Sequence, residues 1–393
     1  MAEGFHAVPE QIAGYGVLVD TVSKQLSGIQ QYVAENAKAG PGFDGLVMSL
    51  IKAPVDTYAL ETSKRILSHG NHLVDTGTEL KRTAWDYSGA DKSAYQIFAD
   101  DGISNPNVPP QVTGYKDFPD PVSYPAGSDP AAALKPPEIA EADIQSKVDE
   151  VGGSLKVIDW AVSQVTGWSP VEAITEPISG NWNSLKASGE ALKNAGTALE
   201  ESLDNLTKAL PTLDPHWNGG AAQDFHGYIT KLVNGAGQEG PLNRIVGGVY
   251  DLVADQIEKV AQFVVDKLKH VVDQILEKLA TGWIPFIGWA RLIDFIKECV
   301  GIFQQAREMV NTVQELVENA KQLIEIAQDP VGAAQEAIEE KLQPIEEQVD
   351  RYQRGAEVAK NLADVADTQA WEDSPDQGYT SIPGNADPRR PGA

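Results

Sequence analysis

The chain has 393 residues, 42% of them apolar, which is enough for two or three domains with buried cores. Its 57 acidic residues outnumber the 31 basic ones, and the formal net charge of -26 disfavours binding to nucleic acid or to an anionic membrane, because both repel a polyanion. The single cysteine, Cys299, excludes an internal disulfide framework and a cysteine-based zinc site.

The start of the chain lacks a basic segment followed by an apolar run, so neither a Sec nor a twin-arginine signal is visible. This pattern is typical of a cytosolic protein, or of one exported by a route that leaves no cleaved signal. The most apolar stretch, residues 283–303, is too polar for a membrane span because it contains Arg291, Asp294, Lys297 and Glu298.

Residues 1–100 are predicted to form one helical hairpin. Pro9 stands at the expected first position of a helix, where its fixed φ angle is favourable. A glycine-rich turn over residues 39–45 separates this helix from a second one, in which large and small apolar residues alternate from Ile66 to Tyr87. Pro54 is expected to kink or restart the second helix. Apolar residues of the first helix recur in steps of three and four: Ile12, Tyr15, Val19, Val22, Leu26, Ile29 and Val33.

Residues 101–140 are rich in proline and glycine and show no periodicity, which predicts an extended and mobile linker. Helical periodicity returns over residues 141–235, with a capping box at Ser169–Glu172 and a long apolar stripe from Trp182 to Leu210. The turn at residues 214–220 closes a second hairpin.

Residues 236–370 are predicted to form a longer hairpin with a helical extension. The segment 235–240 interrupts or softens the preceding helix, and an eleven-residue apolar repeat then favours a nearly straight helix from Val246 to Leu279. An apolar turn around Trp283 leads to the returning helix, and the polar residues 371–393 are expected to be disordered. The predicted fold is all-α: long antiparallel helical hairpins packed as a bundle, with a linker and a disordered tail.

Two short motifs stand at ends of these hairpins. Trp217-Asn218-Gly219 lies at the turn between two amphipathic helices, where glycine allows a tight reversal. Tyr87 and Asp91 follow at positions i and i+4 at the end of the first hairpin, so on a helix both side chains would face one partner. An ordinary hydrophobic turn and a chance pair are the alternatives.

With these motifs, residues 1–100 resemble the EspC-like family of ESX secretion-associated proteins, through Val8-Pro9-Glu10 and the segment Leu80–Asp91. Residues 180–235 resemble the WXG-motif, early-secreted-antigen superfamily, through Trp217–Phe225. The chain is thus similar to fused proteins of the EspB type, in which one chain supplies both halves. The long hairpin at about 242–330 is a departure from the minimal members.

The resemblance implies a four-helix bundle in which the Tyr-x-x-x-acid signal lies beside the Trp-x-Gly turn and both are recognised for export. Tyr87, Asp91, Trp217 and Gly219 would form that signal. It also implies a type VII secretion ATPase and a chaperone as partners, with small WXG-family helical proteins as further candidates. The hairpins could pair within the chain, since a tether raises their effective concentration to about millimolar, or each could bind a separate partner.

The expected function is that of a substrate or adaptor of a type VII secretion system, secreted or held at the cell surface, with no cofactor. An enzyme is not expected, because the sequence has no phosphate-binding glycine loop and no triad-like set. His69 and His72 are interpreted as ordinary helix histidines rather than metal ligands, and Cys299 as a buried structural thiol.

Two other functions remain open. The apolar turn with Trp283, Ile284 and Phe286 covers the end of a bundle or, alternatively, inserts into a membrane interface, which would make the protein a membrane-active effector. The chain could also be the leader of a toxin that lacks its toxic domain.

Overall fold

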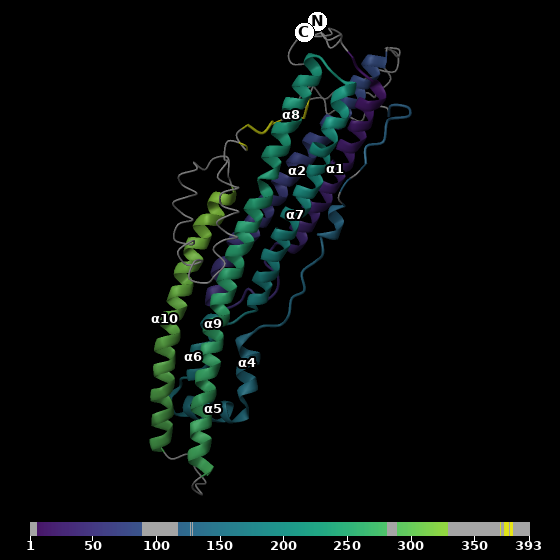
Figure 1. The fold of residues 1–393 in the computed structure, drawn as a ribbon. Coiled ribbons are helices and arrows are strands. Elements are labelled where there is room, and N and C mark those ends of the chain that lie inside the picture. The colour runs from purple at the N-terminus through teal and green to yellow at the C-terminus, as the bar shows by residue number, and fades with distance from the viewer. Residues whose placement is uncertain are drawn as a thin grey trace, which may run out of the picture.

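The computed structural model describes residues 6–88, 117–125, 127, 129–280, 289–328, 370, 373–376 and 378–379. Within these ranges every regular element is a helix, and the only β-type pairing is one isolated bridge. The long helices run side by side along an elongated molecule (Figure 1). The predicted all-α bundle of long antiparallel hairpins is therefore confirmed.

The first hairpin consists of α1 (Pro9–Asn36) and α2 (Leu46–Ser88). Pro9 opens α1, as predicted, whereas Pro54 lies inside α2 without ending it. The small residues of α2 allow the two helices to approach closely: a Cβ atom at position 77 would collide with the side chain of Asp20. The alternation of large and small residues in the sequence therefore marks the face of α2 that contacts α1.

The second hairpin consists of α7 (Trp182–Leu213), the short turn η3 (Asp214–His216), α8 (Gly220–Gly237) and α9 (Glu239–Ala280). Only Gln238 separates α8 from α9, and its φ of -66° and ψ of -20° are nearly helical. The two helices consequently run on as one rod (Figure 1).

Because α8 and α9 form one rod, the glycines near residue 240 serve as packing positions instead of breaking a helix. A Cβ atom at Gly196 of α7 would lie 2.8 Å from the carbonyl oxygen of Gly240, and one at Gly189 would lie 2.7 Å from that of Gly247. These glycines let α7 and α9 pack backbone to backbone. The boundary predicted between residues 235 and 236 therefore does not separate two packing units, since α9 continues along α7.

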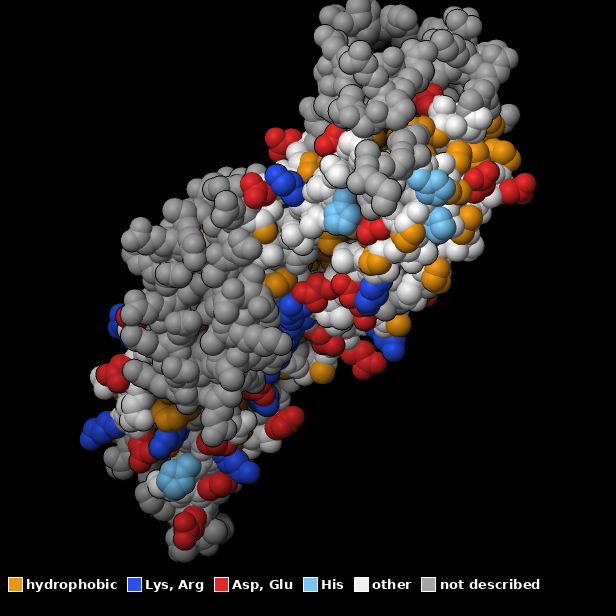
Figure 2. Space-filling model, turned by 45° about the horizontal axis from the view of Figure 1, so that its top comes forward, with side chains coloured by type: hydrophobic (Ala, Val, Ile, Leu, Met, Phe, Trp, Pro, Cys, Tyr) orange, Lys and Arg blue, Asp and Glu red, His pale blue; other side chains and the backbone are white. Residues whose placement is uncertain are grey.

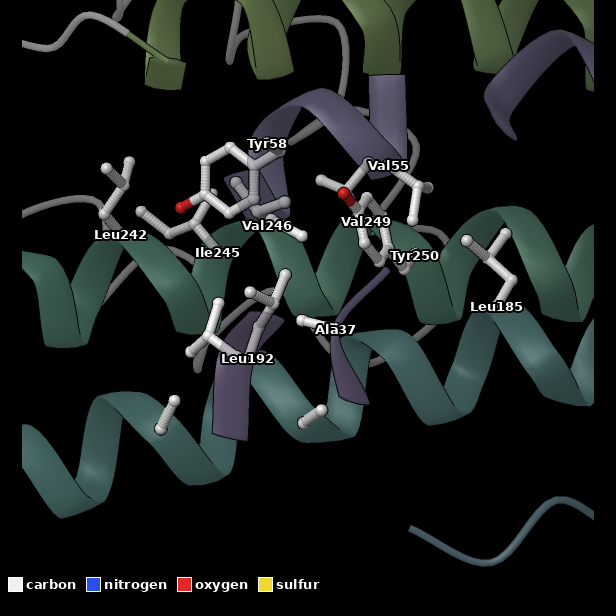
Figure 3. Close-up of a cluster of buried hydrophobic side chains, with 14 of the residues drawn as sticks. Ala37, Val55, Tyr58, Leu185, Leu192, Leu242, Ile245, Val246, Val249 and Tyr250 are labelled. Carbon is white, nitrogen blue, oxygen red and sulfur yellow. The ribbon is translucent and has the colours of Figure 1, made fainter. Parts of the chain in front are cut away.

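The two hairpins pack on each other within the chain. α1 lies against α7, and side chains of α2 meet α9 in the interior. Figure 3 shows one part of this core, a buried cluster to which α2 contributes Tyr58, α9 contributes Val246 and α7 contributes Leu192. Each hairpin thus covers the apolar stripe of the other.

The far half of α9 leaves this bundle and pairs with α10 (Trp289–Gln328), which also contacts α2. Short helices cover this pair: α4 (Ile144–Val151), α5 (Gly153–Thr166), α6 (Pro170–Thr175) and the turn η2 (Glu176–Ile178). Ser169 caps α6 by accepting a 3.1 Å hydrogen bond from the Glu172 N–H, as its capping box predicts. Cys299 of α10 is buried, and burial raises the pKa of its thiol to about 12.

The described part of the linker is extended but lies against the bundle. Tyr124 donates a 2.8 Å hydrogen bond to Gln11 Oε1, and the Val122 N–H donates to the carbonyl of Glu10 at 2.9 Å. Near the short turn η1 (Pro130–Ala132), Tyr32 donates to the Lys135 carbonyl at 2.7 Å. The prediction of a mobile linker is corrected for this part, because its aromatic side chains are buried in the core. Residues 101–116 lie outside the described residues.

Candidate functional site

The candidate site lies where the start of α1, the end of α2 and the turn between α7 and α8 meet. Ala7 and Trp217 form an antiparallel bridge. Its frame consists of the Val8 N–H donating to the His216 carbonyl at 2.8 Å and the Asn218 N–H donating to the His6 carbonyl at 2.9 Å. The Asn218 side chain also accepts from the His6 N–H at 2.7 Å. The N-terminal segment therefore holds the tryptophan turn in place.

Trp217 is almost fully buried, with 3% of its surface exposed. Its ring lies 5.4 Å from the ring of Phe225 and 6.5 Å from the ring of Tyr87. Gly219 follows with a φ of 103°, a conformation that side-chain-bearing residues rarely adopt. The glycine of the Trp-x-Gly motif is thus required by the reversal that starts α8.

Tyr87 comes from the last turn of α2 and is half-buried against this tryptophan. Burial raises the pKa of the Tyr87 hydroxyl; the indole of Trp217 opposes the shift and the charge of Asp86 adds to it. Two residues predicted to form one signal, 130 positions apart by the difference of their numbers, are therefore adjacent in space. Asp91, the acidic half of the tyrosine motif, lies outside the described residues.

An aromatic cluster packs against this pair through Phe225, which contacts Trp217. Tyr15 of α1 stacks edge-on against Phe225 at 5.5 Å and against Tyr124 of the linker at 5.6 Å. Its hydroxyl donates a 3.0 Å hydrogen bond to the carbonyl of Leu206 on α7. Burial raises the Tyr15 pKa strongly, so the phenol stays neutral. The cluster therefore links both hairpins and the linker next to the Trp217 turn.

Sequence reasoning placed Tyr15 only on an apolar stripe and assigned no role to the linker aromatics. Phe118 of the linker packs against Trp85 at 5.0 Å, near the end of α2. Because an extended docked segment has no helical period, the sequence pattern held no signal for Phe118 or Tyr124 beyond their being aromatic residues in a polar stretch.

A polar cluster, distinct from the aromatic one, lies deep in the bundle and was not predicted. Arg65 of α2 pairs with Glu239 at the start of α9, with Nη2 lying 3.0 Å from Oε2, and its Nη1 donates to the carbonyl of Gln328 at 2.9 Å. Nearby, Tyr58 donates to Asn243 Oδ1 at 2.8 Å. The cluster joins α2, α9 and the end of α10. Its acidic residue, Glu239, lies in the segment 235–240, which the sequence pattern indicated only as an interruption of a helix.

His69 and His72 lie on α2 next to this cluster, with ring centroids 6.4 Å apart. Burial lowers the pKa of His69 to about 4; Glu239 opposes this shift, and His72 and Arg65 add to it. Over the described ranges, no group of three or more His, Cys, Asp and Glu side chains is arranged to hold a metal ion.

The predicted membrane tip of Trp283, Ile284 and Phe286 lies outside the described residues. None of the helices that the structure describes is both long enough and apolar enough to cross a membrane. The comparisons with protein-family models, curated proteins and solved structures give no match to this chain.

Proposed function

We propose that this protein is a non-enzymatic substrate or adaptor of a type VII (ESX) secretion system, and that a composite surface around Tyr87 and Trp217 is its export signal. The observation that carries the proposal is the 6.5 Å contact between the two rings, which brings together motifs of two separate hairpins. Gly219, with its φ of 103°, shapes the turn, and Asp91 would complete the signal on the tyrosine side.

Such a signal depends on folding. Tyr87 and Trp217 meet only when α1 and α2 pack on α7 and α8, and the bridge between Ala7 and Trp217 closes the same pole. A secretion ATPase that binds this surface would therefore select the folded chain. A chaperone and small WXG-family proteins are the other proposed partners, and the protein would act through helix–helix contacts, without a cofactor, once secreted or held at the cell surface.

The test compares Tyr87→Ala with Tyr87→Phe, each expressed with its ESX system. The alanine variant should lose most of its export, because it removes the ring beside Trp217, and the phenylalanine variant should report the share of recognition that needs the hydroxyl. Export is measured as the ratio of protein in culture filtrate to protein in cell lysate.

Folding has to be followed in parallel, since Tyr87 is half-buried rather than free in solvent. Tyr250→Phe, which keeps its ring and removes a buried hydroxyl of α9 that makes no hydrogen bond to the described residues, serves as the matched control. Normal export of a folded Tyr87→Ala chain would remove the proposed signal.

A further inference from the structure

A short segment of the C-terminal tail packs beside the end of the bundle where Tyr87 meets Trp217, which we call the export pole. Tyr379 is buried, with 5% of its surface exposed, although residues 371–393 were expected to be disordered. Its ring lies 5.2 Å from the ring of Phe225 and 5.4 Å from that of Tyr228, both on α8. The expectation of disorder is therefore corrected at Tyr379, because an aromatic side chain is buried between two helices.

Hydrogen bonds to α2 and α8 hold the same segment in place. The Tyr379 N–H donates to Thr76 Oγ1 of α2 at 3.2 Å, and the Tyr379 hydroxyl donates to the carbonyl of Ala221 at 3.0 Å. Thr76 Oγ1 is also hydrogen-bonded to the hydroxyl of Tyr228 at 3.1 Å. The tail thus bridges α2, through the Thr76 hydroxyl, and α8, through the Ala221 carbonyl.

Tyr379 lies in a groove between α2 and α8. Close contacts in this groove require small residues at two positions. A Cβ atom on Gly378 would collide with the side chain of Asp75, and one on Gly235 of α8 would lie 2.5 Å from Ser374 Oγ. A glycine followed by a tyrosine is therefore the pattern that this groove selects: the first residue passes under Asp75 and the second fills the space between Phe225 and Tyr228.

The groove shares a wall with the export pole. Phe225 contacts Tyr379 on one side and Trp217 on the other. Burial raises the pKa of the Tyr379 hydroxyl strongly, and the charge of Asp224 adds to the shift, so the phenol stays neutral in the groove.

We propose that the groove between α2 and α8 is a docking site for the Gly378–Tyr379 segment, and that this segment is a releasable latch over the aromatic pole. One buried ring and two hydrogen bonds must offset the conformational entropy of the ordered tail residues, so the docked state exchanges with an open one. Opening would uncover Phe225 and Tyr228 beside Tyr87 and Trp217. The docking stands on the contacts alone, and only its effect on export rests on the proposed function.

Docking is tested with a fluorescently labelled synthetic peptide of residues 370–383, added to the full chain. The peptide should bind a Tyr379→Ala chain at least about tenfold more tightly than the wild-type chain, whose groove is already filled by its own tail. A peptide with Gly378→Ala serves as the matched control and should not bind, because its Cβ atom would collide with Asp75. Equal binding of the unmodified peptide to both chains would overturn the docking site.

A measurement in the wild-type chain guards against weak binding in trans. Hydrogen exchange at the Tyr379 amide should be slowed at least about tenfold relative to an unstructured peptide, because this amide donates to Thr76, and Thr76→Val should remove the protection. Exchange of the wild-type amide at the unstructured rate would overturn docking whatever the peptide does.

The effect on export is read separately. With docking established, a Tyr379→Ala chain should be exported faster than wild type. Unchanged or slower export of this variant would remove the latch and leave the groove in place, whereas failure of the export signal itself is reported by Tyr87→Ala.

Discussion

At the scale of single residues, the residues of the pole have different structural roles: packing, backbone conformation and hydrogen bonding. Trp217 fills the space between Tyr87 and Phe225, so it packs the interior of the pole besides being part of the proposed signal. Gly219 supplies a backbone conformation, and Tyr15 anchors the cluster to α7 through its hydroxyl. A variant at the pole is therefore expected to change stability, and any effect on the proposed export has to be measured against that change.

The glycine of the motif offers a clean stability test. Gly219→Ala should lower the free energy of unfolding by about 1–3 kcal/mol, because a Cβ atom is strained at a φ of 103°. Gly227→Ala on α8 is the matched control: no atom lies within 4 Å of its added Cβ, so it should be neutral or slightly stabilising. Urea unfolding followed by circular dichroism measures both, and equal effects would contradict the assignment.

His69 predicts a dependence of stability on pH. Its folded-state pKa of about 4 lies below the ordinary histidine value, so the unfolded chain binds the proton more readily. Stability should therefore fall as the pH drops from about 6.5 towards 4, by up to about 3 kcal/mol from this group.

The variant His69→Gln should flatten this part of the profile, and the exposed His270→Gln on α9 should leave it unchanged. The comparison is made by urea unfolding at several pH values. Parallel profiles for the wild-type and His69→Gln chains would show that the half-buried imidazole of His69 contributes nothing to the loss of stability in acid.

At the scale of elements, the register between α7 and α9 is set by glycines inside and ion pairs outside. Along the surface of this helix pair, Lys186 pairs with Asp255 at 2.9 Å and Lys193 with Asp251 at 2.7 Å. Half-exposed pairs of this kind contribute little energy each, so the close backbone contact at Gly196 is the stronger constraint.

That contact can be tested directly. Gly196→Ala should destabilise the chain by about 1–3 kcal/mol, because its Cβ atom would meet the backbone of Gly240 rather than a movable side chain. Gly301→Ala on α10 is the control, since nothing lies within 4 Å of its added Cβ. Thermal unfolding distinguishes the two; a neutral Gly196→Ala would mean that α7 and α9 are not packed this closely.

At the scale of the whole molecule, two hairpins cover each other and the connecting segments are drawn onto the bundle. In Figure 2, acidic and basic side chains are interspersed along the described part of one face. The linker reaches α1 through Tyr124 and the tail reaches α2 and α8 through Tyr379. The pole that unites Tyr87 and Trp217 therefore collects segments from the beginning, middle and end of the chain.

Residue periodicity by itself determined the helices, because burying one face of a helix imposes a spacing of three and four residues that is local and visible. The apolar stripes of α1, α2, α7 and α9, the cap at Ser169 and the buried position of Cys299 were all predictable on this ground.

Tertiary structure alone decided what those helices bring together. The contact of Tyr87 with Trp217, the pair of Arg65 with Glu239 and the docking of Tyr379 join residues far apart in the chain. No local period records such contacts, because they depend on how whole helices are placed. For the same reason the glycines at 235–240 look like a break in the sequence and serve as a packing surface in the fold.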